Sequence, residues 1–381
     1  MARTRANRRT VRRTSSTRRT PSTRSTATAL RGAAVLTAGA LALTACSVTG
    51  SSDDASGTSS SGAGTITLVT HDSFHLSDGL IEQFEQETGL TVEQVAPGDG
   101  GALVNELVLT KDAPLGDVVY GIDNTFASRA IEEGVLEPYT SSVPAAEDAA
   151  QYAVDDSGEL TAIDMGDVCL NVDHSWFSEN GIVEPTTLED LTDPTYQDLT
   201  VVTNAATSSP GLAFLLATIG AFGEDGWQDY WTALEANGLK VAESWSDAYY
   251  SDFSGGGGGG SRPIALSYAS SPPETIPDGG TEPTTGAMLN TCFRQVEYAG
   301  VIAGTSNPEG AQQLIDFLLS DEVQADIPGS MYMYPVSTSV DLPADWAEWA
   351  PLSDDPFTVP AADITANRDE WVSTWTDLVT S

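Results

Sequence analysis

Basic residues are scarce in most of this 381-residue chain. The sequence has 16 Lys and Arg against 55 Asp and Glu, and ten of the 16 basic residues lie before residue 46. Residues 46–381 therefore carry six basic and 55 acidic residues, a formal charge of −49. So few basic side chains cannot form a surface that binds nucleic acid or anionic lipid. An acidic field of this size instead attracts cationic ligands.

Motifs for catalysis and for metal binding are also missing. The chain has only three histidines, none in a recognisable triad context, and no G-x-S-x-G, H-E-x-x-H or C-x-x-C motif. The glycine run at 255–260 lacks the lysine of a phosphate-binding loop, so we expect a plain loop there. These absences give no support to a serine hydrolase or a metalloenzyme.

The N-terminal segment has the order of a secretory signal. Ten arginines and no acidic residue precede an apolar run at 33–46, which is too short to span a membrane. The sequence "LTAC" at 43–46 predicts a lipoprotein signal peptide over 1–45 with Cys46 as the lipidated residue; an ordinary signal with a chance cysteine is the alternative. Residues 46–64, rich in Ser, Gly and Asp, predict a flexible tether. We thus expect a lipid-anchored protein on the outer face of a bacterial cell membrane.

Two cysteines remain beyond Cys46, namely Cys169 and Cys292. Outside the cytoplasm an even pair permits one disulfide bond. Two separate buried thiols are the alternative.

Strand-like and helix-like segments alternate from residue 65 onwards, which predicts an α/β fold with a largely parallel sheet. We expect strands, or strands running into turns, at 65–74, 90–95, 116–123, 159–173, 199–204, 262–273 and 293–304. We expect helices at 76–89, 102–110, 187–193, 211–222, 225–238 and 307–327, and a helix followed by a turn at 124–139.

The segment "AATSSPGLAFLLA" at 205–217 is typical of a helix start. Such a start offers free backbone N–H groups and hydroxyl groups, and it favours an anion or an electron-rich oxygen. A local site for an anion is unexpected in so acidic a chain.

Several short segments together resemble a known family. They are "THDSF" (70–74), "DVVYGIDN" (117–124), "TSSPGLAFLL" (207–216), "SWSDAYY" (244–250), "LSYASSP" (266–272), "MYPV" (333–336) and "RDEWVSTW" (368–375). In this order they resemble the type II periplasmic solute-binding proteins of ABC importers and, more narrowly, the thiamine-binding subgroup.

The resemblance implies two lobes with a ligand cleft between them and strands that cross from lobe to lobe as a hinge. The lobes would be 65–165 plus 300–381, and 166–299. The crossing strands would be 166–172 and 294–300. If Cys169 and Cys292 lie on neighbouring crossing strands, they can form a disulfide bond.

The resemblance also implies a set of ligand-binding residues. These are Asp72, Asp99, Gly100, Asp123, Ser208, Ser209, Trp245, Tyr268, Ser270, Ser271 and Tyr332. Thiamine combines a cationic thiazolium ring with an aminopyrimidine ring and a hydroxyethyl arm. The cationic ring suits aromatic faces and carboxylates, and the arm suits the hydroxyl groups of Ser208 and Ser209. Some of these residues also have a structural alternative. It is helix capping for Ser208, Ser209 and Asp123, core packing for Trp245, and a hydroxyl-rich turn without a ligand for Tyr268, Ser270 and Ser271.

Three positions depart from the subgroup. His71 replaces a tyrosine, Tyr332 stands where a tryptophan is common, and Glu274 lies where an aromatic residue is expected. We expect these changes to favour unphosphorylated thiamine, or a related cation, over thiamine phosphates.

Other ligands of the same fold stay open. Ferric iron would use Tyr249 and Tyr250, with His71 and His75 available as further ligands, and polyamines are another cationic class. The resemblance implies a binding protein without a cofactor or a bound metal, rather than an enzyme or an adhesion or structural lipoprotein. For each of these ligands it implies a monomer that delivers the ligand to an ABC permease driven by its ATPase.

Overall fold

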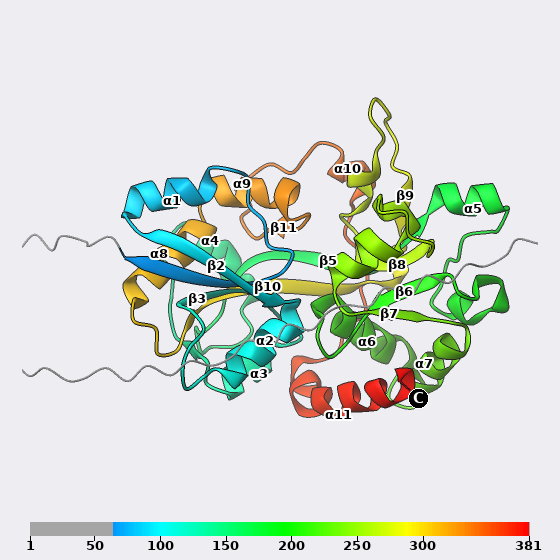
Figure 1. The fold of residues 1–381 in the computed structure, drawn as a ribbon, viewed down its shortest axis with the longest axis horizontal. Coiled ribbons are helices and arrows are strands. Elements are labelled where there is room, and N and C mark those ends of the chain that lie inside the picture. The colour runs from blue at the N-terminus through cyan, green and yellow to red at the C-terminus, as the bar shows by residue number, and fades with distance from the viewer. Residues whose placement is uncertain (1–63, 381) are drawn as a thin grey trace, which may run out of the picture. The chain divides into compact units, whose positions relative to one another are not determined.

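The computed structural model describes residues 64–380, and these residues form an α/β fold around one mixed sheet (Figure 1). The predicted signal peptide, Cys46 and all but the last residue of the predicted tether lie outside the described residues. Within residues 64–380, no helix has both the length and the apolar content needed to cross a membrane.

The sheet follows the strand order β2-β1-β3-β10-β5-β8-β6-β7, and three short strands, β4, β9 and β11, pair at its side. The strands are β1 (Thr65–His71), β2 (Thr91–Gly98), β3 (Val118–Asp123), β4 (Leu136–Glu137), β5 (Thr161–Asp173), β6 (Thr200–Thr203), β7 (Lys240–Ala242), β8 (Ile264–Tyr268), β9 (Thr285–Ala287), β10 (Phe293–Ile302) and β11 (Tyr334–Pro335). The helices are α1 (Leu80–Thr88), α2 (Gly100–Leu109), α3 (Ala127–Glu132), α4 (Ala145–Ala149), α5 (His174–Asn180), α6 (Ser209–Phe222), α7 (Trp227–Ala236), α8 (Pro308–Leu318), α9 (Asp321–Ser330), α10 (Trp346–Trp349) and α11 (Ala361–Val379).

Two long strands connect the halves of the sheet. β1 pairs in parallel with β2 and β3 at one end, and β6 pairs in parallel with β7 and β8 at the other. Between them β10 and β5 run antiparallel to each other and extend across the middle of the molecule (Figure 1). They contain the segments predicted to cross, 166–172 and 294–300. We call the part around β1–β3 the first lobe and the part around β6–β8 the second lobe.

A disulfide bond joins Cys169 of β5 to Cys292, the residue before β10. Both cysteines are fully buried and pack with Ala269. The bond therefore fastens the two crossing strands to each other at the second-lobe end of the hinge.

The core of the second lobe is built around α6, whose residues from Ser209 to Ile219 are all buried. This helix contacts β5, β8 and β10 on the sheet and α7 on its other side, which explains its uniformly apolar sequence. On α7, Trp227, Tyr230, Trp231 and Leu234 are buried, as the helical spacing predicts.

The C-terminal helix α11 packs against α7, with the rings of Trp375 and Trp231 edge to face at 5.5 Å between centroids. The family resemblance implied that all of residues 300–381 belong to the first lobe. The lobe limits stay a prediction, and this contact favours counting α11 with the second lobe.

Two predicted helices differ from the structure. The segment 307–327 forms two helices, because Ser320 accepts a hydrogen bond from the Val323 N–H group and caps a new helix, α9. The helix and turn expected at 124–139 are present, since α3 ends at Glu132 before Gly134 turns the backbone with φ 64°. The segment 187–193 forms only a 3-10 turn, Glu189–Thr192.

Candidate functional site

A cavity of about 320 Å³ lies where the two lobes meet. The first lobe contributes the end of β1 and the start of α2, and the second contributes the start of α6 and the residues after β7 and β8. The lining includes seven of the predicted ligand residues: Asp72, Asp99, Ser209, Trp245, Tyr268, Ser271 and Tyr332. No lysine or arginine of residues 64–380 lines this cavity.

The four other predicted residues, Gly100, Asp123, Ser208 and Ser270, do not line the cavity. Asp123 is fully buried and accepts hydrogen bonds from Thr125 and from the Phe126 N–H group before α3. Burial raises the pKa of Asp123 to about 6. Ser208 caps α6 by accepting from the Gly211 N–H group. Both residues thus have the structural roles that were their alternatives, so their contact with a ligand stays a prediction.

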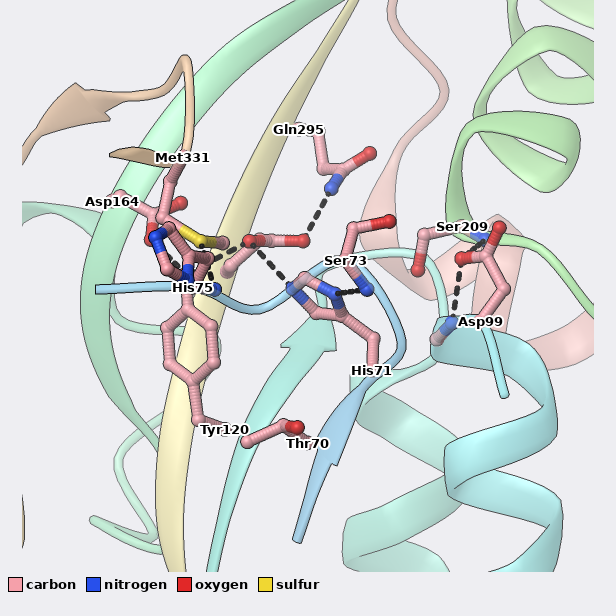
Figure 2. Close-up of polar contacts among 12 residues, drawn as sticks. Thr70, His71, Ser73, His75, Asp99, Tyr120, Asp164, Ser209, Gln295 and Met331 are labelled. Carbon is pink, nitrogen blue, oxygen red and sulfur yellow. Dashed lines mark hydrogen bonds and ion pairs between the residues drawn. The ribbon is translucent and has the colours of Figure 1, made fainter. Parts of the chain in front are cut away.

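Asp99 joins the two lobes through its carboxylate (Figure 2). One oxygen accepts from the Gly100 N–H group at 2.7 Å and from the Ser209 N–H group at 3.4 Å. The other oxygen accepts from the Trp245 N–H group at 2.9 Å. The N-termini of α2 and α6 therefore both point at this carboxylate. Asp99 occupies the anion-binding position that the sequence predicts at the start of α6.

Glycine at position 100 makes this close approach possible. A Cβ atom there would lie 2.1 Å from the Ser209 hydroxyl oxygen, which no real contact allows. The lobes also meet at Ser73 and Ser246, whose hydroxyl oxygens are 3.2 Å apart.

An aromatic wall closes the second-lobe side of the cavity. The Trp245 ring stacks on Tyr249 with 5.1 Å between centroids and 16° between planes, and it meets Tyr250 and Tyr268 edge to face. Its indole N–H group donates to Ser267 at 3.0 Å. These contacts fix the indole plane, so the wall presents a rigid face to a flat ligand.

Tyr332 adds a further aromatic side chain in an unusual backbone conformation, with φ 56°. The Ser270 hydroxyl group donates to the Tyr332 carbonyl oxygen and holds this turn. A bulky residue in the left-handed region is strained, and such strain is often found at binding sites.

The floor of the cavity holds an acidic cluster on the crossing strands (Figure 2). Glu297 of β10 accepts from the Gln295 side-chain N–H group at 2.9 Å and from the Tyr120 hydroxyl group at 3.1 Å. The same Tyr120 hydroxyl group also donates to Asp164 of β5. The His71 Nε2 atom lies 3.6 Å from Glu297 Oε2.

Glu297 is the cavity residue that sequence reasoning missed. It lies in the apolar strand "FRQVEYAGVIAG", where a buried acidic residue is out of pattern, and that exception was the available signal. Ser73, Ser246, Ser330, Met331 and Met333 also line the cavity without having been predicted.

A second cavity, also of about 320 Å³, lies on the other side of the aromatic wall. It shares Trp245, Tyr250, Ser271 and Tyr332 with the first cavity and adds Glu274. Burial raises the pKa of Glu274.

The tyrosine pair considered for iron is part of this wall. Tyr249 is buried and its ring stacks on Trp245, and burial raises the pKa of its hydroxyl group. The Ser73 N–H group donates to His71 Nδ1, and His71 Nε2 lies 3.6 Å from Glu297. Within residues 64–380, no three His, Cys, Asp or Glu side chains are grouped so as to hold a metal ion.

A family comparison decides what kind of protein this is. Residues 113–363 match the model of the bacterial extracellular solute-binding proteins. The chain belongs to this family. Its members are solute carriers, in agreement with the expectation of a binding protein rather than an enzyme.

This solute-binding protein resembles the thiamine-binding members. It is 28% identical to the thiamine-binding periplasmic protein of Escherichia coli (strain K12), over 81% of this chain and 92% of that protein. It is also 28% identical to the thiamine-binding periplasmic protein of Brucella suis biovar 1 (strain 1330), over 82% of this chain and 91% of that protein.

Solved structures agree on the two-lobed fold. A periplasmic thiamin binding protein superposes with a TM-score of 0.72 at 26% identity, covering 83% of this chain and 96% of that one. A ferric binding protein from Campylobacter jejuni superposes with a TM-score of 0.65 at 17% identity, over 82% and 99% of the two chains, and shows the fold alone.

Proposed function

We propose that this solute-binding protein captures thiamine outside the cytoplasm and delivers it to an ABC importer. The observation that carries the proposal is the lining of the first cavity. It combines a fixed tryptophan face with the carboxyl groups of Asp72, Asp99 and Glu297 and contains no lysine or arginine of the described residues. This combination suits a flat ring with a permanent positive charge. The similarity to thiamine-binding relatives supports the same ligand.

We further propose that the ligand is thiamine without phosphate. The helix starts that would bind a phosphate group already hold the Asp99 carboxylate. A phosphate placed there would meet that carboxylate at close range and be repelled. Glu274 adds a further carboxyl group behind the aromatic wall.

Lobe movement and membrane attachment belong to the same proposal. Ligand would bind while the lobes are apart, and the contacts of Asp99 and of Ser73 with the second lobe would form on closure. The closed monomer would then dock on the permease, whose ATPase drives import. Lipidation at Cys46 would keep the protein on the outer face of the membrane.

The test is a fluorescence titration of the purified protein with thiamine, thiamine monophosphate and ferric citrate. We expect thiamine to quench the tryptophan fluorescence saturably and ferric citrate to give no saturable response. The affinity for thiamine monophosphate should be lower than that for thiamine by about tenfold or more. Trp245→Ala should weaken thiamine binding by about tenfold or more, because a stacked aromatic face is lost. Tighter binding of the monophosphate would contradict the phosphate-free ligand, and binding of iron or a polyamine but not thiamine would contradict the ligand class.

A further inference from the structure

The second cavity has no role in the proposed function, although it is as large as the first. Trp245, Tyr250, Ser271 and Tyr332 line both cavities. A ligand that binds at the aromatic wall can therefore contact these side chains from either side. Tyr250 is 46% exposed, so its ring is not fixed by packing on all sides.

The glycine run at 255–260 forms one side of the second cavity, and three of its residues line the space. A Cβ atom at Gly256 or at Gly258 would overlap backbone carbonyl oxygens of the π-helical turn Asp247–Asp252. Such turns are rare and are frequent at functional sites. The run thus consists of glycine because it lies directly on the turn that carries Tyr249, which its sequence did not indicate.

The Tyr249 hydroxyl group is buried at the second cavity without a partner. The residue is 6% exposed, and its hydroxyl oxygen has no hydrogen-bond partner among residues 64–380. The residue lines the second cavity and not the first. A buried hydroxyl group that stays unpaired lowers stability, so its presence in a cavity wall points to a partner supplied by a ligand.

Glu274 supplies a hydrogen-bond acceptor to the same space. It lies on the 3-10 turn Pro272–Thr275 after β8 and is exposed. Its carboxyl group acts electrostatically on the hydroxyl groups of Tyr249, Tyr250 and Tyr332. None of the described lysines, arginines and histidines lines the second cavity. The cavity therefore offers a ligand one carboxylate without a counter-ion and one free hydroxyl group.

We propose that the second cavity binds the uncharged aminopyrimidine ring of thiamine, and that Glu274 recognises the amino group of this ring. The inference rests on the proposed function and deepens it, because that function gives a place to the cationic ring only. The amino group donates an N–H to the Glu274 carboxylate, and the adjacent ring nitrogen accepts from the Tyr249 hydroxyl group. A single carbon atom joins the two rings of thiamine, so the thiazolium ring stays at the Trp245 face in the first cavity.

Two analogues separate the contributions of the two cavities. Oxythiamine keeps the thiazolium ring and carries a carbonyl oxygen in place of the amino group. Its carbonyl oxygen would face the Glu274 carboxylate, and two acceptors without a shared proton repel each other, so its binding should be weaker. An N-methylated thiazolium fragment of thiamine lacks the pyrimidine ring and reports on the first cavity alone.

The test is calorimetric titration with thiamine and oxythiamine, together with NMR titration with the thiazolium fragment. The wild-type protein should bind thiamine about tenfold or more tightly than oxythiamine. Glu274→Ala should reduce this preference to about threefold or less and leave the affinity for the fragment unchanged. Glu235→Ala is the control, because it makes the same change on the exposed face of α7, and it should keep the wild-type preference.

Tyr249→Phe removes only the hydroxyl group. It should weaken thiamine binding about threefold, as expected for one uncharged hydrogen bond, and leave the affinity for the fragment unchanged. The urea midpoint should stay the same or rise, because the hydroxyl group has no partner in the described protein. Unchanged thiamine affinity together with a lower midpoint would show a structural hydroxyl group and contradict its contact with the ligand.

A wild-type preference in Glu274→Ala, or equal binding of thiamine and oxythiamine by the wild-type protein, would overturn this inference and leave the proposed function standing. A lower affinity of Glu274→Ala for the thiazolium fragment would also overturn it, because Glu274 would then act on the cationic ring. If the wild-type protein does not bind thiamine, the proposed function and this inference are both wrong.

Discussion

Asp99 accounts for the unexpected helix start in this acidic chain. The segment around Ser209 offers N–H groups to an anion, and the protein itself supplies that anion from the first lobe. Burial raises the pKa of Asp99, while the N–H groups of Trp245 and Gly100 stabilise its ionised form. A single side chain thus caps one helix, faces a second and lines the cavity.

Gly100→Ala should disturb the contact between the two helix starts. The added Cβ atom would lie 2.1 Å from the Ser209 hydroxyl oxygen, so the Ser209 side chain must turn away or the lobes must move apart. We expect about a tenfold or greater loss of thiamine affinity with little change in the unfolding midpoint, measured by titration and by urea unfolding. Gly329→Ala on α9 is the matched control, because an added Cβ atom there meets nothing within 4 Å. Equal affinity of the two variants would show that the contact at Gly100 is not needed for binding.

Asp123→Asn should change the pH dependence of stability. The pKa of Asp123 is raised to about 6 by burial, so this residue stabilises the fold below about pH 4, and that contribution is lost as pH rises through 6. The asparagine keeps an oxygen that accepts from Thr125 and carries no charge. Relative to the wild-type protein, Asp123→Asn should gain about 3 kcal/mol of unfolding free energy between about pH 4 and about pH 7. Urea unfolding at both pH values measures this, and a difference that is constant with pH would contradict it.

At the scale of elements, the Cys169–Cys292 bond holds the crossing strands together. It joins residues 123 positions apart in the sequence, so it removes many conformations from the unfolded chain. Replacing both cysteines with alanine should lower the unfolding free energy by about 2–5 kcal/mol. Chemical denaturation of the variant and of the wild-type protein with dithiothreitol should give the same loss. An unchanged midpoint in both samples would contradict a stabilising bond.

The elements also show where sequence reasoning succeeds. The strands β1, β2, β3, β5, β6, β8 and β10 and the buried face of α7 were predicted, because alternation and helical spacing report directly on which residues face the core. The short strands β4, β7, β9 and β11 were not predicted. The break between α8 and α9 was missed, because Ser320 acts as a cap only through the geometry of the chain. The helix α11 was not predicted as an element. Its buried residues Ile364, Arg368, Trp371 and Trp375 follow helical spacing, but the charged Arg368 interrupts the apolar pattern.

The candidate site was predicted only in part, because some of its contacts join segments that are far apart in the sequence. Asp72, Trp245 and Tyr268 could be named from short segments that resemble a family, and they do line one cavity. Glu297 could not be placed from its strand alone, because its role depends on neighbours from β1, β3 and β5 that the sheet brings together.

At the scale of the whole molecule, the acidic surplus should speed the arrival of a cation. Six basic residues oppose 55 acidic ones beyond residue 45, so the surrounding field attracts positive ligands. The association rate of thiamine, measured by stopped-flow fluorescence, should fall about tenfold between about 10 mM and about 500 mM NaCl. The rate for thiochrome, the uncharged tricyclic oxidation product of thiamine, should change less than about twofold. Equal salt dependence of the two rates would show that the field does not guide the ligand.

The chain enters the described fold through β1 in the first lobe, and its last helix, α11, packs on α7 in the second (Figure 1). The two ends therefore belong to different sides of the cleft, and any opening of the lobes changes the distance between them. A donor fluorescent protein fused at residue 64 and an acceptor fluorescent protein fused after residue 379 would convert ligand capture into an optical signal. The natural order of elements thus provides the layout of a genetically encoded sensor for the bound solute, with no rearrangement of the chain.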